Sequence, residues 1–262
     1  MVQWNPEDYA KHSAAQLSWA RELISRLDLK GNETLLDIGC GDGKITAEIA
    51  QHLPQGRAVG IDSSRNMIDF ARKAFPRAKH PNLEFRRMDA RAIRLPQTFD
   101  IAFSNATLHW IDDQPAVLRG VRAALRPGGR LMISCAGRGN AGEVLAIFEL
   151  AIREEPWRDY FLDFQFHYHF HGDEEYAGWL RDAGFEIARI ALVDRDMVHD
   201  GPDGLTGWVR TTWHPFTEPV PEDRREVFIA EIVRRYLASH PLDPAGESHV
   251  RMVRLEVDAT RP

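Results

Sequence analysis

The sequence has few cysteines and no long apolar run. Its 262 residues include only two cysteines, Cys40 and Cys135, which cannot form the disulfide framework of a small secreted protein. No apolar stretch approaches the roughly 18–20 residues needed to cross a bilayer, and the first residues lack a signal-peptide pattern. We therefore expect a cytoplasmic protein that makes no use of a membrane.

The chain also lacks an excess of positive charge. It has 33 lysines and arginines against 39 aspartates and glutamates, a formal net charge of -6. Proteins that bind nucleic acids usually carry a basic stripe or patch, and here acidic residues lie close to the arginine pairs. We expect a small-molecule partner and no nucleic acid. The sequence leaves the oligomeric state open.

Short apolar runs alternate with amphipathic segments along the chain. The expected strands lie at 34–38, 58–61, 83–87, 99–104, 130–135, 185–193 and 250–257. The expected helices between the early strands lie at 44–52, 64–75 and 114–125, with a later one at 176–183. This alternation predicts an α/β fold: a Rossmann-like, seven-stranded, mostly parallel sheet with helices on both faces. The last run alternates polar and apolar residues, so we expect it to be an edge strand.

A glycine-rich turn follows the first expected strand. Asp37 precedes three alternating glycines, Gly39, Gly41 and Gly43, and only residues without a Cβ let a ligand approach the backbone closely. The second strand ends about twenty residues later in Asp62, whose carboxylate can accept hydrogen bonds from a ribose diol. The two features together predict a nucleotide-type cofactor site.

The glycine spacing indicates which nucleotide is bound. G-x-G-x-G differs from the G-x-G-x-x-G that packs a pyrophosphate onto a helix N-terminus, and the carboxylates of Asp37 and Asp42 favour a cation over phosphates. S-adenosyl-L-methionine (SAM) has a ribose, an adenine, an amino acid and a sulfonium, but no phosphate. The stretch from Asp37 to Gly43 resembles the first motif of the class I SAM-dependent methyltransferases, D-x-G-C-G-x-G. The resemblance implies that SAM is the cofactor.

Polar residues also follow the third and fourth expected strands, as Asp89 and then the run from Asn105 to Trp110. Ligands of open α/β sheets bind at these carboxyl ends. In the methyltransferases that the chain resembles, matching positions contact the adenine and line the passage to the acceptor, which makes His109 the expected catalytic residue. Asp89 could instead cap a helix, and His109 could pack on the core. The cofactor contacts implied are Asp37, Gly39, Cys40, Gly41, Asp62, Ser63, Met67, Asp89, Ala90, Asn105 and Ala106.

Four short motifs narrow the resemblance. They are Trp4-Asn5-Pro6-x-x-Tyr9, Asp62-Ser63-Ser64-x-x-Met67, Asn105 to Trp110, and Gly207-Trp208-Val209. They are similar to the trans-aconitate methyltransferases and their small-carboxylate relatives. The resemblance implies one methyltransferase domain over 1–262, with an N-terminal helical cover at 1–30 and a SAM-binding core at 31–136. Trp4 and Tyr9 would then close the site, or would hold the first helix to the domain.

A long segment at 200–243 separates the last two expected strands. Connections of this length are usually functional, so we expect a helical lid with an amphipathic helix at 222–237. Trp208 and Trp213 could line a substrate pocket or simply pack, whereas packing is favoured for Phe228 and Tyr236.

The sequence favours O-methylation of a small-molecule carboxylate, either trans-aconitate-like or more apolar. A carboxylate is ionised at neutral pH, so it needs hydrogen-bond donors and no general base. The expected substrate contacts are Trp4, Tyr9, Trp110, Trp208, Arg210 and His214. Two alternatives remain open: methylation of carbon, nitrogen or hydroxyl oxygen with His109 or His214 as the base, and a non-catalytic SAM-binding module.

One further segment, from Phe166 to His171, alternates histidines with aromatic residues. If it forms a strand, then His167, His169 and His171 share one face. No zinc-type ligand spacing accompanies them, so we expect a pocket-lining or exposed histidine row and no metal.

Overall fold

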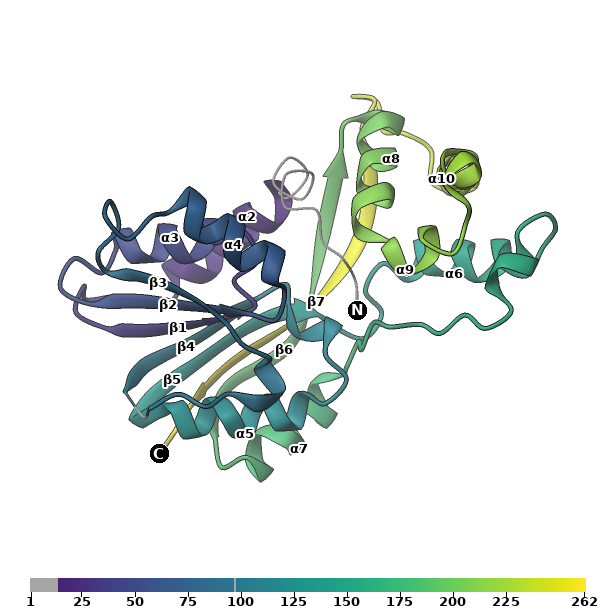
Figure 1. Ribbon diagram of the computed structural model, residues 1–262. Helices are drawn as coiled ribbons and strands as arrows, with labels where there is room; N and C mark the ends of the chain where they lie inside the picture. The colour runs from purple at the N-terminus through teal and green to yellow at the C-terminus, as the bar shows by residue number, and fades with distance from the viewer. Residues whose placement is uncertain (1–13, 97) are drawn as a thin grey trace.

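The computed structural model describes residues 14–96 and 98–262, which form a seven-stranded sheet flanked by helices (Figure 1). The strands are β1 Thr34–Ile38, β2 Arg57–Asp62, β3 Leu83–Arg87, β4 Phe99–Asn105, β5 Leu125–Ala136, β6 Glu186–His199 and β7 Ser248–Thr260. Their order is β3-β2-β1-β4-β5-β7-β6, and neighbouring strands from β3 to β5 are parallel. The predicted α/β fold and mostly parallel sheet are confirmed.

The expectation that the last strand lies at the edge is wrong. β7 pairs antiparallel with β5 on one side and with β6 on the other, and β6 occupies the edge. The polar residues in the alternating pattern of β7 include Arg254 and Glu256, which are only 4% exposed. The pattern therefore marks buried charges and not a solvent-facing side, a distinction that alternation alone cannot make.

Helices cover both faces of the sheet, as the sequence predicts. Figure 1 shows α2 (Ala14–Ser25), α3 (Lys44–Gln51) and α4 (Arg65–Ala74) on one face, with α5 (Gln114–Ala124) and α7 (Asp173–Asp182) on the other. Side chains cap the free backbone N–H groups at the N-termini of two of these helices. Ser64 accepts from Met67 N at the start of α4, and Asp113 accepts from Ala116 N at the start of α5. Within the described residues no helix combines the length and apolar character that crossing a membrane requires.

A second helical layer lies beyond one end of the sheet. It contains α6 (Gly142–Ala151), α8 (Gly201–Thr212), α9 (His214–Thr217) and α10 (Glu222–Ser239), and the long strands β6 and β7 extend into it (Figure 1). The segment at 200–243 supplies three of these helices. The fourth, α6, comes from the connection between β5 and α7, which sequence reasoning did not assign to the lid. A separate apolar core that includes Phe148, Trp157 and Phe228 holds the layer together.

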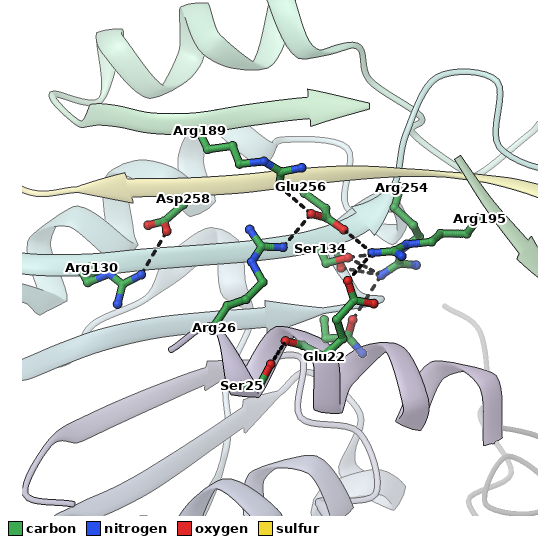
Figure 2. Close-up of polar contacts among 11 residues, drawn as sticks. Glu22, Ser25, Arg26, Arg130, Ser134, Arg189, Arg195, Arg254, Glu256 and Asp258 are labelled. Carbon is green, nitrogen blue, oxygen red and sulfur yellow. Dashed lines mark hydrogen bonds and ion pairs between the residues drawn. The ribbon is translucent and has the colours of Figure 1, made fainter. Parts of the chain in front are cut away.

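A buried carboxylate links the N-terminal helix to the antiparallel strands. Glu256 on β7 accepts hydrogen bonds from Arg26, directly after α2, at 2.7 Å, and from Arg189 and Arg195 of β6 at 2.6 Å and 3.1 Å (Figure 2). Desolvation favours the neutral acid, but these three guanidinium groups hold the pKa of Glu256 below its usual range. The cluster therefore fixes α2 against the sheet by charge and not by apolar packing alone.

We expect Glu256→Ala to lower the free energy of unfolding by about 3 kcal/mol, because it leaves several partly buried guanidinium groups without their shared anion. Asp258→Ala is the matched control on the same strand. Asp258 pairs only with Arg130, and both side chains are more exposed than that of Glu256. Asp258→Ala should lower the free energy of unfolding by less than about 1 kcal/mol, measured by denaturant unfolding. Equal losses for the two variants would contradict the structural role of the Glu256 cluster.

Candidate active site

A cavity of about 730 Å³ lies where the sheet meets the helical layer. Cavities of about 300–1,000 Å³ hold cofactor-sized and drug-sized molecules. Its walls come from the carboxyl ends of β1 to β4, from residues 167–170, from α8 and from β7. Eleven residues singled out from the sequence line it: Gly39, Gly41, Asp62, Ser63, Met67, Asp89, Ala90, Ala106, His109, Trp110 and Trp208.

The glycine turn after β1 has the backbone that the sequence pattern predicts. Gly39, Gly41 and Gly43 have φ values of 75°, 52° and 83°, in the left-handed region that favours glycine. A Cβ on Gly39 would lie 2.0 Å from Cγ2 of Thr107, so this position excludes a side chain. A Cβ on Gly41 would meet nothing within 4 Å. The turn therefore leaves open space against the backbone at Gly41, as a bound ligand requires.

Asp62 at the end of β2 is held in place by two backbone N–H groups. Its Oδ2 accepts from Gly41 N at 3.0 Å and its Oδ1 accepts from Ser64 N at 2.8 Å. Burial raises the pKa of Asp62, while these two hydrogen bonds oppose the increase. A carboxylate oxygen can accept more than one hydrogen bond. Asp62 thus fits a ribose diol at the cavity wall.

Three predicted cofactor residues, Asp37, Cys40 and Asn105, do not line the cavity. Asp37 is 2% exposed and accepts a hydrogen bond from the Thr46 hydroxyl at 2.6 Å. Cys40 is buried in the apolar core beside the turn, and Asn105 Oδ1 accepts from Arg254 at 3.2 Å. These side chains therefore support the cavity wall from behind.

Asp89 after β3 caps a helix and also lines the cavity, which are the two roles that the sequence allowed. Its Oδ1 accepts from Arg91 N at 2.9 Å and caps a short 3₁₀ helix, Ala90–Ala92, while the residue also lines the cavity. Hydrogen bonds from the Arg91 guanidinium hold the pKa of Asp89 below its usual range, so the carboxylate is ionised.

His109 is buried in the cavity wall as a neutral hydrogen-bond donor. Its Nδ1 accepts from Ala136 N at 3.3 Å, which places the ring proton on Nε2. Burial lowers the pKa of His109 to about 3, with further contributions from the charge of Arg254 and from His169. An imidazole with so low a pKa is too weak a base to take a proton from an acceptor, so His109 is suited to donating a hydrogen bond and not to general-base catalysis.

Residues 166–171 do not form the strand that their alternation suggested. The segment has no regular secondary structure, and His167, Tyr168, His169 and Phe170 all line the cavity. No neighbouring strand pairs with it, and instead His169 N donates to His109 O at 2.8 Å. The expected grouping of side chains is nevertheless present in part: the rings of Tyr168 and Phe170 stack with centroids 5.4 Å apart, and those of His169 and His171 with centroids 6.4 Å apart.

The lid places Trp208 and Arg210 on different sides of α8. Trp208 and Trp213 line the cavity and pack edge to face, with ring centroids 5.6 Å apart. Arg210 forms a bidentate pair with Glu226 instead, at 2.8 Å and 2.5 Å. Residues two apart on a helix point about 200° apart, so only one of this pair can face the cavity. His214 at the start of α9 is also absent from the cavity lining. We therefore leave Arg210 and His214 out of the acceptor site.

Arg254 is a cavity residue that sequence reasoning missed. It lines the cavity from β7, and its Nη2 donates to Ser134 O at 2.7 Å. Its guanidinium also lies 5.4 Å from the ring centroid of Trp19. The available signal was a charged residue in the alternating pattern of the last strand, which the edge-strand interpretation assigned to a solvent-facing side. Trp4 and Tyr9 lie outside the described residues.

One group of side chains among the described residues could offer metal ligands, at Asp243, Glu247 and His249. These residues lie outside the cavity lining, and His249 is already held by Asp196 at 2.7 Å and Asp243 at 3.3 Å. Backbone N–H groups of Ala245 and Glu247 also donate to Asp243. These hydrogen bonds stabilise the turn that leads into β7.

Comparisons with known proteins agree with this geometry. A family model for a methyltransferase domain matches residues 35–129, which include the glycine turn and Asp62. An uncharacterised methyltransferase of Schizosaccharomyces pombe is 30% identical over 88% of this chain and 89% of its own length. The chain belongs to the SAM-dependent methyltransferases. The predicted enzyme class is thereby confirmed.

Further relatives of this methyltransferase bear out the narrower resemblance. A trans-aconitate 2-methyltransferase of Escherichia coli is 28% identical, and the match covers 100% of this chain and 99% of the relative. A solved methyltransferase structure from Bacillus halodurans has a TM-score of 0.64 at 16% identity, covering 94% and 99% of the two chains. A Haemonchus contortus N-methyltransferase solved with S-adenosylhomocysteine has a TM-score of 0.62 at 18% identity, covering 98% of this chain and 57% of that one. These structures share the fold.

We expect Asp62→Ala to weaken SAM binding to this methyltransferase about 10–100-fold, because it removes a charged acceptor from the ribose position. Asp113→Ala is the matched control, since Asp113 caps α5 outside the cavity lining. It should reduce thermal stability slightly and leave the SAM dissociation constant unchanged. Calorimetric titration measures both. Unchanged affinity in Asp62→Ala would contradict the ribose assignment.

The raised pKa of Asp37 gives a second prediction. Burial raises it from 3.8 to about 7, so the folded chain holds this proton more tightly than the unfolded chain does. The contribution of Asp37 to the free energy of unfolding should therefore fall as pH rises from 3.8 to about 7. Asp37→Asn removes this titrating group. As the pH rises, the variant should therefore become more stable relative to the wild type, measured by denaturant unfolding. A constant difference would show that Asp37 titrates normally.

Proposed function

We propose that this methyltransferase transfers the methyl group of SAM to a carboxylate oxygen of a small-molecule acid. The observation that carries the proposal is the state of His109. It lies at the position expected of a catalytic residue, yet burial holds its pKa at about 3 and its Nε2 carries a proton. A hydroxyl acceptor would need a base at this position. A carboxylate is ionised at neutral pH and needs only hydrogen-bond donors.

Residues at the carboxyl ends of β1 to β3 would hold the cofactor. Asp62 would accept hydrogen bonds from the ribose hydroxyls, and the open space against the backbone at Gly41 would take the amino-acid portion. Asp89 and Met67 would border the adenine at the far wall. When bound there, SAM supplies a sulfonium methyl group that is already activated for transfer.

The protein's part in the reaction is then alignment and exclusion of water. A bond forms between the carboxylate oxygen and the methyl carbon while the carbon–sulfur bond breaks and its electron pair stays on sulfur. No proton is gained or lost in this step. Holding two reactants in line can lower a barrier by about 7–11 kcal/mol, which is a large share of what an enzyme supplies. The indole rings of Trp208 and Trp213, 3% and 1% exposed, close the cavity on the lid side.

The curated relatives support a carboxylate acceptor. Relatives with the name trans-aconitate 2-methyltransferase match this chain over its full length at 28–29% identity. Trans-aconitate presents carboxylates as its nucleophilic groups, so the same reaction type extends to this chain without a change in the catalytic requirement.

We expect kcat with an acid acceptor to be constant from about pH 6 to about pH 9, because neither the acceptor nor His109 titrates there. His109→Leu should lower kcat about 10–100-fold, because it removes one hydrogen bond to a charged group. His109→Gln keeps an amide N–H near the position of Nε2 and should retain more activity than His109→Leu. A fall in kcat below neutral pH, abolished equally by both substitutions, would show that His109 acts as a base.

A further inference from the structure

The two halves of the cavity differ in chemistry. The cofactor half, from the ends of β1 to β3, has backbone and carboxylate groups. The acceptor half, from the end of β4, residues 167–170, the lid and β7, combines aromatic and thioether walls with polar side chains such as Asn140, His169 and Thr211. Its large apolar side chains are Trp110, Tyr168, Phe170, Met197, Trp208 and Trp213. Several of these rings touch, and the centroids of Trp110 and Tyr168 are 4.4 Å apart.

Cationic side chains are scarce in the acceptor half. Among the described lining residues, Arg254 is its sole arginine or lysine, because Arg65, Arg87 and Arg91 belong to the cofactor half. Arg91 is also bound to both Asp89 and Asp112. Arg138 pairs with Glu175 outside the cavity lining.

Arg254 is rigidly held in the cavity wall. Neutral oxygens of Ser134 and Asn105 accept from its guanidinium, which Figure 2 shows reaching from β7 toward Ser134. The residue is 4% exposed, and its positive charge contributes to the low pKa of His109. A guanidinium has five N–H donors in a planar fork that matches a carboxylate.

The surroundings of Arg254 add to the positive potential. Arg254 lies beside a cluster in which the carboxylates of Glu22 and Glu256 meet three guanidinium groups, from Arg26, Arg189 and Arg195 (Figure 2). Together with Arg254, the described part of this region therefore carries more positive than negative charge beside one end of the acceptor half. An anion is favoured at that end.

We propose that the acceptor is a monocarboxylic acid with a planar apolar body, its carboxylate held by Arg254 and His109 and its body packed against the aromatic rings. This inference rests on the proposed function and narrows its substrate class. One guanidinium matches one carboxylate. Among the described lining residues, further carboxylates would find neutral side chains and no second arginine or lysine, and burying a charge without a counter-ion is strongly unfavourable. The acceptor thus differs from the tricarboxylate in the names of the curated relatives.

The substrate class is tested with the purified full chain, saturating SAM and two sets of acids. One set contains apolar monocarboxylic acids of graded size, from phenylacetate through trans-cinnamate to biphenylacetate. The other contains trans-aconitate and citrate. Methyl esters are quantified by mass spectrometry. We expect kcat/KM for the best apolar acid to exceed that for trans-aconitate by at least about 100-fold. The reason is that trans-aconitate would bury two further carboxylates without counter-ions.

The outcomes separate this inference from the function on which it rests. Preferred esterification of trans-aconitate would overturn the monocarboxylate inference and leave carboxylate methylation standing. Esterification of neither set, in protein that binds SAM, would overturn both.

Arg254→Met and Arg254→Lys test the anchor. We expect Arg254→Met to raise KM for the acid at least about 10-fold while the SAM dissociation constant changes less than about 3-fold, with partial rescue by Arg254→Lys. Arg251→Met is the matched control, because Arg251 lies on the same strand, pairs with the exposed Asp194 and does not line the cavity. A loss of SAM affinity with unchanged KM for the acid would assign Arg254 to the cofactor's carboxylate instead.

A charge-specific readout separates anchoring from a structural role. The wild type should bind an apolar acid about 10-fold more tightly than the primary amide of the same acid, measured as competitive inhibition. In Arg254→Met this preference should disappear. A preference for acid over amide that survives in Arg254→Met would overturn the assignment, whatever the effect of the substitution on stability.

Discussion

The buried charges of β7 are the constraint on which the rest of the structure depends. Arg254 and Glu256 lie two residues apart on β7, so they share one face of the sheet, and both are only 4% exposed. Glu256 pairs with Arg26, directly after α2, and with Arg189 and Arg195 of β6, which fixes α2 to the sheet. Arg254 instead borders the cavity. The strand β7 thus holds α2 against the sheet and also places a positive charge in the cavity wall.

The electrostatics and the chemistry are consistent with each other. A buried guanidinium beside His109 favours the neutral imidazole, which weakens it as a base but keeps an N–H donor at the reacting end of the cavity. The same positive field favours the binding of a carboxylate nucleophile, because the carboxylate is negatively charged before the reaction begins. The cavity is therefore better suited to orienting an anion than to creating one.

The sequence predicted the local and repetitive features of the fold. Glycine spacing, the acid at the end of β2 and the alternation of strands and helices follow from backbone geometry over short distances. Arg254 could not be placed in this way, because its role depends on the insertion of β7 between two strands far away in sequence. Helical periodicity could separate Trp208 from Arg210 but could not tell which of them faces the cavity. The contribution of α6 to the lid was missed for the same reason, since only the tertiary packing brings it to α10.

The central claim, methyl transfer to a carboxylate, is tested most directly by the chemical stability of the product. The full chain is incubated with SAM labelled in its methyl group and a metabolite extract, and labelled species are collected and treated with mild base. A methyl ester releases its label as methanol under these conditions, which is the result that the account predicts. A labelled product that keeps its methyl group in base would be an ether, an N-methyl or a C-methyl compound, and would contradict it.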